Sequence, residues 1–277
     1  MKYTRLLDQK RKEKGILIAS HQGYAGGNII LNTPRAMINA IRHGADIVEL
    51  DIARTSDDVY YVFHQNLEPR HLKTDTKICE MTSKELDAMF LWNNANIMSY
   101  FHVSTLDHMM ELLKKEDVLI NLDKCDHFRE ELFAKLDTYG MEEQFIVKGT
   151  CDRSYLDCVA NHKTKYMFMP LIHSMEDIEI AFGYGDSLNI VGIELIFQNF
   201  DHEHMSEKVI NMLKDKGYYL WANAIDLGRG FNINAHIGDD ISMLEDPDKG
   251  WGKLMDTGFD VLQTDFPPVL LDYIQNR

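Results

Sequence analysis

Acidic side chains in or directly after apolar runs predict a metal site. Glu49 and Asp51 stand two residues apart in the run IVELDIA, and Asp123 directly follows VLINL. Residues two apart on a strand project to the same side, so these two carboxylates would repel each other. A bound cation relieves that repulsion, and an all-oxygen ligand set favours Ca²⁺ or Mg²⁺. The alternative is a salt bridge to Lys124 or Lys148.

Two histidines also come at the ends of apolar runs. His21 follows ILIAS, and His64 ends VYYVFH. Because the pKa of an imidazole lies close to neutral, a histidine can serve as general base or general acid. We therefore expect His21 and His64 to form an acid–base pair beside the carboxylates. The other histidines are expected to be structural, and the segment His202-Glu203-His204 is expected to be a solvated helix start.

These side chains need a scaffold that gathers distant strand ends. Apolar runs alternate with amphipathic segments that carry helix caps such as Thr33-Pro34, Ser104 and Ser174. Repeated strand–helix units predict a parallel sheet, and eight of them favour a single TIM (β/α)8 barrel domain over residues 1–277. An open doubly wound sheet is the alternative. The predicted strands are residues 16–20, 47–53, 118–122, 145–149, 166–170, 190–197, 218–224 and 261–265.

Two segments are longer than the connections that a regular strand–helix repeat needs. Residues 59–64 follow the second strand too closely for a crossover helix and predict an appended hairpin, within a small insertion at about 60–103. Residues 225–250, after the seventh strand, form a long loop rich in glycine and aspartate. Loops of that length are usually functional or disordered.

The active site of a TIM barrel lies at the carboxyl ends of its strands. Besides the residues above, the predicted strands carry several polar side chains and one tryptophan near those ends. Trp221 has two interpretations, because it could pack against the carbon skeleton of a substrate or belong to the barrel core. The polar side chains are Lys148, Glu194, Asn223 and Asp265.

Composition excludes several classes of partner. The net charge of −15 is spread along the chain, which argues against nucleic acid as a partner. No apolar run approaches the ~20 residues of a membrane span, so stable membrane insertion is not expected. The charged amino terminus lacks the apolar segment of a signal peptide, which favours a cytoplasmic protein. The four cysteines form no CxxC pair and are expected to be reduced.

The segments SHQG, GADIVELD and YYVFHQNLEPR resemble the glycerophosphodiester phosphodiesterase family. That family has a His-Arg-Gly turn, an Asn-Thr pair before the first helix, a GAD-x-x-E-x-D strand and a Phe-His-Asp turn. The later segments VSTLDHMMELL, LWANA and DVLQTDFPPVLLDYI extend the resemblance over nearly the whole chain. It implies a TIM barrel with a small insertion after strand two.

The resemblance also implies roles for single residues. His21 and His64 become the acid–base pair, Glu49 and Asp51 become metal ligands, and Asp123 stands where the family has a third ligand, a glutamate. Three positions depart from the family pattern. Gln22 replaces an arginine that contacts phosphate, Leu31 replaces a glutamate and Gln65 replaces an aspartate. The remaining candidates for holding phosphate are Arg70, Lys148 and the cation. Further candidates for contacting substrate are Gln22, Glu194, Trp221 and Asn223.

The expected function is metal-dependent hydrolysis of a small-molecule glycerophosphodiester to glycerol 3-phosphate and an alcohol. His21 is taken as the base and His64 as the acid, although the sequence does not order them. Two alternatives stay open: hydrolysis of another phosphodiester, such as a lysophospholipid or sphingomyelin, and a non-catalytic barrel that binds phosphorylated ligands. The sequence does not indicate the leaving alcohol or the oligomeric state.

Overall fold

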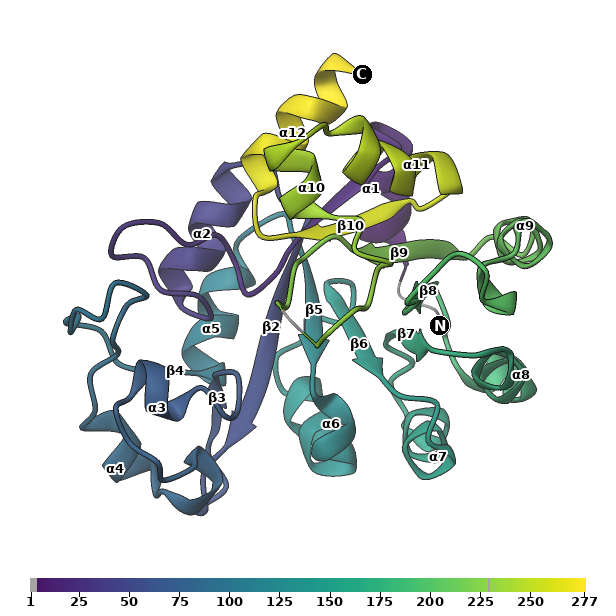
Figure 1. The fold of residues 1–277 in the computed structure, drawn as a ribbon. Helices are drawn as coiled ribbons and strands as arrows, with labels where there is room; N and C mark the ends of the chain where they lie inside the picture. Colours follow the sequence, from purple (N-terminus) through teal and green to yellow (C-terminus); the bar gives the residue numbers. More distant parts are fainter. Residues whose placement is uncertain (1–3, 229) are drawn as a thin grey trace.

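The computed structural model describes residues 4–228 and 230–277, and its centre is a closed barrel of parallel strands (Figure 1). The ring order is β1-β10-β9-β8-β7-β6-β5-β2, and pairing of β1 with β2 closes it. This closure confirms the predicted TIM barrel and excludes the open sheet. The ring strands are β1 (Leu17–Ser20), β2 (Ile47–Arg54), β5 (Leu119–Asp123), β6 (Phe145–Gly149), β7 (Met167–Ile172), β8 (Gly192–Leu195), β9 (Tyr219–Asn223) and β10 (Val261–Thr264).

Helices surround the barrel, and their caps follow the sequence signals. The Thr33 hydroxyl accepts the N–H of Ala36, and Ser174 caps its helix in the same way. Ser104 differs from the prediction, because Thr105 is the actual cap. The outer helices are α1 (Arg5–Lys14), α2 (Pro34–Arg42), α5 (Leu106–Leu113), α6 (Arg129–Asp137), α7 (Arg153–Asn161), α8 (Met175–Gly183), α9 (Glu207–Asp215), α10 (Asp239–Leu244), α11 (Lys253–Thr257) and α12 (Pro267–Asn276).

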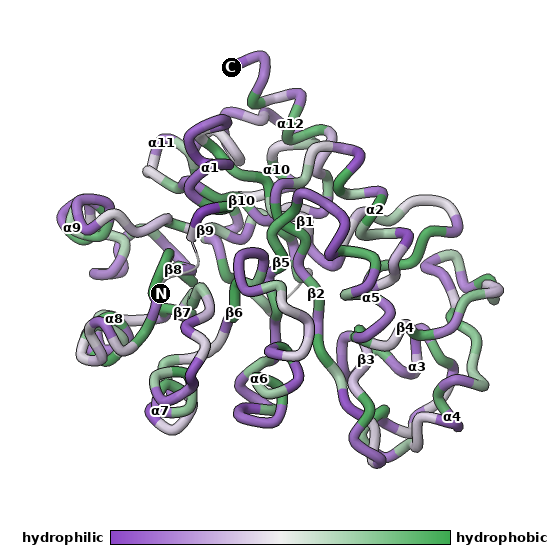
Figure 2. Tube along the Cα trace, turned by 180° about the vertical axis from the view of Figure 1, so that it is seen from behind, coloured by the Kyte–Doolittle hydropathy of each residue, from purple (hydrophilic) through white to green (hydrophobic). Residues whose placement is uncertain are grey.

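Apolar side chains form two layers around the strands. One layer fills the inside of the barrel, with Leu17, Leu119 and Trp221 among its members, and the other lies between the strands and the helices. Figure 2 shows hydrophobic residues along the central strands and hydrophilic ones on the outer faces of the helices. Strands buried on both faces need such near-continuous hydrophobicity. The barrel is therefore packed with apolar side chains below the site, and the polar residues of the site lie toward the carboxyl ends of its strands.

The predicted hairpin is present and opens a small lobe beside the barrel (Figure 1). Strand β3 (Tyr60–Val62) pairs antiparallel with β2, and β4 (Ser104–Thr105) pairs with β3. Strand β4 was not predicted, since two polar residues carry no hydrophobic pattern. Between β3 and β4 lie α3 (Glu68–His71) and α4 (Ser83–Asp87). A separate apolar cluster that includes Tyr61 takes Leu86 from α4 and Leu72 from directly after α3.

The segment 225–250 passes over the carboxyl ends of the strands (Figure 1). Its residue 229 lies outside the described residues. The side chain of Asn234 donates to the carbonyls of Asn223 and Ile225, at 2.9 and 3.2 Å, and thereby fastens the segment to the end of β9. The segment also contains α10, so part of it is regular structure.

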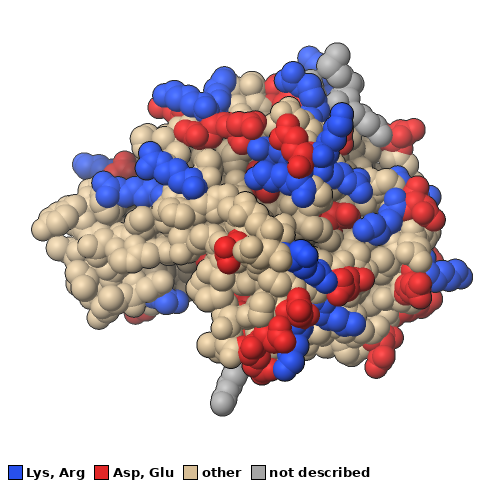
Figure 3. Space-filling model, turned by 90° about the horizontal axis from the view of Figure 1, so that it is seen from above, with Lys and Arg blue, Asp and Glu red and all other residues tan. Residues whose placement is uncertain are grey.

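Two surface features bear on the expected partners. On the face shown in Figure 3, acidic and basic side chains lie interspersed. Among the helices of residues 4–228 and 230–277, none is both long enough and apolar enough to cross a membrane.

Candidate functional site

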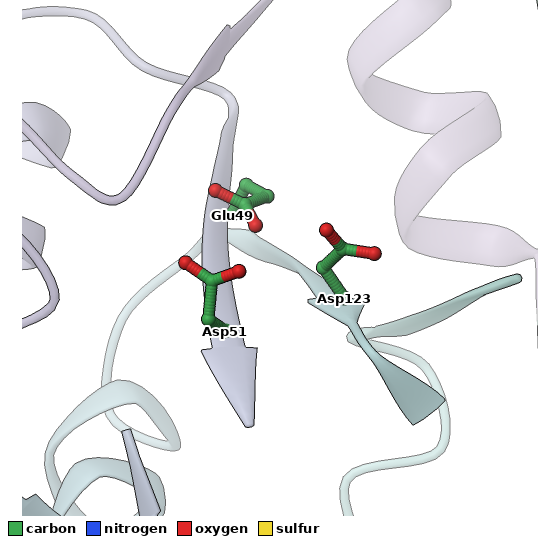
Figure 4. Close-up of side chains that lie close together, drawn as sticks. All are labelled: Glu49, Asp51 and Asp123. Carbon is green, nitrogen blue, oxygen red and sulfur yellow. The ribbon is translucent and has the colours of Figure 1, made fainter. Parts of the chain in front are cut away.

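Three carboxylates meet at the ends of β2 and β5, as predicted from their spacing. These strands are parallel neighbours, and their register pairs Asp51 with Asp123. One oxygen of each of Glu49, Asp51 and Asp123 lies within 4.8 Å of the others. Figure 4 shows the three side chains turned toward a common space. Among the ion pairs of the described residues, none includes Glu49 or Asp51, whereas Asp123 pairs with Lys124 at 3.1 Å. The predicted salt bridge therefore accounts for one carboxylate of the three.

The loop between β1 and α2 donates hydrogen bonds to two of these carboxylates. The backbone N–H of Gln22 donates to Glu49 at 2.9 Å, and its side-chain amide donates to Asp51 at 2.6 Å. Asn32 donates to the same Asp51 oxygen at 2.8 Å. Gln22 and Asn32 both have left-handed backbone conformations, with φ of 54° and 56°. Gln22, expected to contact substrate, instead orients the carboxylates, and Asn32 was not among the predicted site residues.

Charge is unevenly distributed within this group. Burial and the neighbouring charge of Asp51 raise the pKa of Glu49 to about 8. Burial also opposes ionisation of Asp123, but Lys148 and Lys124 outweigh it and lower the pKa of Asp123 to about 2. A buried carboxylate pair that resists double ionisation suits a hard divalent cation, because such a cation supplies the missing positive charge.

His21 follows β1 and is fixed by a carboxylate from β10. Its Nδ1 lies 2.9 Å from an oxygen of Asp265. Burial alone would lower the pKa of His21, but the hydrogen bond to Asp265 and the charge of Glu49 raise it to about 9. The backbone N–H of Asp265 donates in turn to the buried Asp239 at 2.8 Å. Asp239, from the segment 225–250, was not predicted, because nothing in its local pattern separates it from the neighbouring exposed Asp240.

His64 reaches the site from the lobe rather than from a barrel strand. It follows β3, and its Nδ1 donates to the carbonyl of Gln65 at 2.7 Å. Since a carbonyl oxygen only accepts, Nδ1 carries the proton of the neutral ring and Nε2 is left as the acceptor. His64 and His21 line the same pocket, together with the three carboxylates.

Lys148, Glu194 and Asn223 form a buried polar row across the barrel. The ammonium group of Lys148 lies 3.0 Å from Glu194, and Asn223 donates to the other Glu194 oxygen at 2.7 Å. Burial alone would lower the pKa of Lys148, but Glu194 and Asp123 raise it above its ordinary value. All three residues line the pocket, as predicted.

Two predicted substrate contacts lie elsewhere. Trp221 is fully buried in the barrel interior, where its indole N–H donates to Gln263 at 3.1 Å, so the core interpretation holds. Arg70 is exposed on α3 and is not among the described residues that line the pocket. His204 also differs from the prediction, because it is buried and bonds the carbonyl of Ile196 at 3.0 Å.

The pocket itself has a volume of about 220 Å³. Its lining combines the polar residues above with an aliphatic group that the sequence analysis did not single out. Lys124, His173 and Gln263 are further polar residues of the lining. The aliphatic members are Leu171, Ile196, Ile225, Leu227 and Ile233.

Comparisons with known proteins agree with the fold. A family model described as a domain of unknown function matches residues 166–274, which is less than half of the chain. Among curated proteins, no sequence matches significantly. Solved structures do match, among them a glycerophosphoryl diester phosphodiesterase from Parabacteroides distasonis, with 17% identity, a TM-score of 0.77 and coverage of 94% of this chain and 86% of that one.

Two further structures give the same picture. A glycerophosphodiester phosphodiesterase from Thermotoga maritima has 21% identity and a TM-score of 0.66, with coverage of 93% of this chain and 98% of that one. A phosphodiesterase from Oleispira antarctica, solved with the product sn-glycerol-3-phosphate, has 18% identity and a TM-score of 0.67, with coverage of 94% and 96%. At these identities the likeness establishes a shared barrel fold.

Proposed function

We propose that this protein is a divalent-cation-dependent hydrolase of glycerophosphodiesters, which releases glycerol 3-phosphate and an alcohol. The observation that carries the proposal is the meeting of three carboxylate oxygens within 4.8 Å in a pocket that two histidines also line. The resemblance of the sequence to the glycerophosphodiester phosphodiesterase family and the likeness to the barrel with bound sn-glycerol-3-phosphate support the choice of substrate.

Glu49, Asp51 and Asp123 would hold the cation, which is Ca²⁺ or Mg²⁺ by the preference of all-oxygen sites. When bound, such a cation polarises a phosphoryl oxygen and offsets negative charge in the transition state. Four carboxylates and two lysines stand among the described residues of the pocket lining, so the pocket needs added positive charge before it can accept an anion. The residues present therefore fit a divalent cation.

The two histidines would move the protons. His21, whose Nδ1 is engaged by Asp265, would accept a proton at Nε2 from water or from a neighbouring substrate hydroxyl. The charge of Glu49 is one of the causes that raise the pKa of His21 to about 9, and a cation held by Glu49 would offset that charge and allow the ring to be neutral before it acts. His64, whose Nδ1 is engaged by Gln65, would act as the acid in its imidazolium form, in which Nε2 also carries a proton and can donate it to the leaving alcohol. In this assignment Asp265 stabilises the imidazolium that forms on His21, as a carboxylate does for the base in a catalytic triad.

Lys148 and Asn223 would orient the substrate. The ammonium group of Lys148 is available to a phosphate oxygen, and the Glu194–Asn223 pair offers an acceptor and a donor to glycerol hydroxyls. These contacts use charged or polar groups that are already fixed, so little ordering is needed on binding.

The test is release of glycerol 3-phosphate from glycerophosphocholine and glycerophosphoethanolamine, with Ca²⁺, with Mg²⁺ and with a chelator. Cation-dependent release that is lost in His21→Ala and His64→Ala is expected. His108→Ala, at an exposed position on α5, is the matched control and keeps its activity. Cation binding by a folded protein without any release would contradict the proposal and favour a barrel that only binds phosphorylated ligands.

A further inference from the structure

Asp239 is a buried carboxylate of the segment 225–250 that makes no contact with the substrate pocket. Its side chain is 1% exposed, and it is not among the described residues that line the pocket. One of its oxygens accepts the indole N–H of Trp251 and the hydroxyl of Thr264, each at 2.7 Å. The other oxygen accepts the backbone N–H of Asp265 at 2.8 Å. The last residue of β10 and the residue after it are therefore both bound to one carboxylate.

These three contacts favour an ionised carboxylate at position 239. An indole N–H and a backbone N–H can only donate, and the Thr264 hydroxyl, which accepts the N–H of Phe266 at 2.9 Å, has its own proton left for Asp239. Burial raises the pKa of Asp239 to about 7, and the three donors act against that rise. An asparagine would have one acceptor oxygen, so its NH₂ group would face an N–H group in either orientation.

The segment 225–250 and the barrel together fix the position of Asp239. Its backbone N–H donates to the carbonyl of Ala224, directly after β9, at 2.6 Å. The hydroxyl of Ser242 on α10 accepts the backbone N–H of Trp251 at 2.9 Å, which holds the tryptophan beside α10. A Cβ at position 250 would overlap that hydroxyl, so this close approach requires the glycine found there.

His21 depends on the same two residues at the end of β10. Its Nδ1 lies 2.9 Å from the carboxylate of Asp265, and its backbone N–H donates to the carbonyl of Thr264 at 3.1 Å. The side chain of Asp265 is 37% exposed, so burial alone does not hold it against the imidazole. Asp239 therefore binds both residues that contact His21 from β10.

We propose that Asp239 is a positioning residue for the hydrolysis, which holds Thr264 and Asp265 where they orient the imidazole of His21. The inference rests on the proposed function, in which His21 is the base. It makes the segment 225–250 a part of the catalytic apparatus, because the segment supplies the carboxylate that fixes the support of the base. Since Asp239 does not touch the substrate, its loss should lower kcat and leave KM nearly unchanged.

The experiment compares Asp239→Asn with two variants of the same segment. Asp240→Asn removes the neighbouring exposed carboxylate and controls for charge. Ser242→Ala removes a buried hydroxyl that bonds only the backbone of the segment, and controls for a general loss of stability. With glycerophosphocholine and the cation, we expect kcat of Asp239→Asn to fall about 10–100-fold, the loss that a displacement of about 1 Å can cause. Both controls should keep the wild-type kcat.

A second measurement does not depend on turnover. The proton on Nδ1 of His21 gives an NMR signal in protein labelled with ¹⁵N-histidine, and its hydrogen bond to Asp265 slows its exchange with water. In Asp239→Asn this proton should exchange faster than in the wild type, whereas both controls should keep the wild-type rate. If Asp239→Asn does not fold, Thr264→Val decides instead, because it removes one contact of Asp239 without changing a charge. It should change kcat and the exchange rate in the same direction.

The outcomes separate the two proposals. An active wild type, with kcat and Nδ1 exchange unchanged in Asp239→Asn, would overturn the positioning role and leave the phosphodiesterase function standing. An equal loss of kcat in Ser242→Ala, or a loss in Asp239→Asn with unchanged Nδ1 exchange, would also overturn it, since Asp239 would then not act through His21. A folded wild type that binds the cation but releases no glycerol 3-phosphate would refute the proposed function, and the role in hydrolysis with it.

Discussion

The two imidazoles of the pocket differ in what holds their Nδ1 atoms. Asp265 accepts from His21 and carries a charge, whereas the carbonyl of Gln65 accepts from His64 and is neutral. In both histidines the partner binds Nδ1, so that Nε2 is left for proton transfer. A carboxylate partner also stabilises the protonated ring. This difference is the reason for assigning the base to His21, which must hold a proton after the nucleophile has been activated.

Asp265→Asn tests that assignment. The amide lacks the charge that stabilises the imidazolium, and it can turn its NH₂ group toward Nδ1 and impose the other tautomer. We expect kcat to fall about 10²–10⁴-fold, the usual contribution of general acid–base catalysis, with little change in KM. Asp58→Asn is the control, since its side chain is 79% exposed in the turn before β3. Steady-state kinetics that leave kcat of Asp265→Asn at the wild-type value would remove Asp265 from the mechanism.

At the scale of elements, the loop between β1 and α2 determines how the carboxylates point. Asn32 joins this loop to β2 twice, because its side chain donates to the Asp51 carboxylate and accepts the Asp51 backbone N–H at 3.2 Å. Residues behind metal ligands fix ligand orientation, and their loss typically reduces metal affinity.

Asn32→Ala should therefore weaken Ca²⁺ or Mg²⁺ binding about 10–100-fold, measured by titration calorimetry. Asn96→Ala is a matched control, because Asn96 is exposed in the lobe and has the same left-handed backbone conformation, with φ of 62°. This control therefore measures the effect of placing alanine in a left-handed backbone conformation, at a position that makes no contact with Asp51. Equal affinities of the two variants would contradict the role given to Asn32.

The sequence predicted the barrel and the meeting of the three carboxylates for a common reason. Apolar runs and helix caps are local patterns, and parallel strands bring their carboxyl ends to one edge, so Glu49, Asp51 and Asp123 could be placed together. Gln22, Asn32 and Asp239 act through contacts that depend on loop paths, which no periodic pattern encodes. Trp221 was ambiguous because strand position alone does not tell how far below the pocket a side chain lies.

The lobe carries His64, and one side-chain hydrogen bond joins the first strand of the lobe, β3, to α4. The buried ring of Tyr61 on β3 directs its hydroxyl to Asp87 at the end of α4, at 2.8 Å. Tyr61→Phe keeps the packing and removes this bond, so we expect a loss of about 1 kcal/mol in the free energy of unfolding, measured by urea titration. Tyr100→Phe, whose ring is 88% exposed, should cost nothing measurable. Unchanged stability of Tyr61→Phe would show that the bond contributes little.

For the molecule as a whole, the buried carboxylates of the site add to an excess of negative charge that opposes folding. The chain carries a net charge of −15, and its pocket concentrates carboxylates in a buried setting. The folded protein without cation holds protons that the unfolded chain has released, because the pKa of Glu49 is raised to about 8 and that of His21 to about 9. Stability falls with rising pH wherever the folded state binds more protons than the unfolded state.

We therefore expect the chelator-treated protein to lose roughly 1–3 kcal/mol of unfolding free energy between pH 7 and pH 8, at about 1.4 kcal/mol per retained proton and pH unit. Both groups lower the stability as the pH rises, because each binds a proton more tightly in the folded state. The raised pKa of Glu49 keeps its carboxyl protonated in the folded state, and the raised pKa of His21 keeps its ring as the imidazolium. Other buried histidines do not reverse it, because His71 and His204 have lowered pKa values and are neutral above pH 7.

Two conditions separate this effect from a general alkaline loss of stability. Saturating Ca²⁺ or Mg²⁺ requires an ionised Glu49, so the dependence on pH should shrink when the cation is present. Glu49→Gln removes the titrating carboxyl. In the chelator-treated protein, this variant should therefore show a smaller dependence of the unfolding free energy on pH. Urea unfolding at each pH measures both, and a stability that rises from pH 7 to pH 8 in the cation-free protein would show that these two groups do not hold extra protons in the fold.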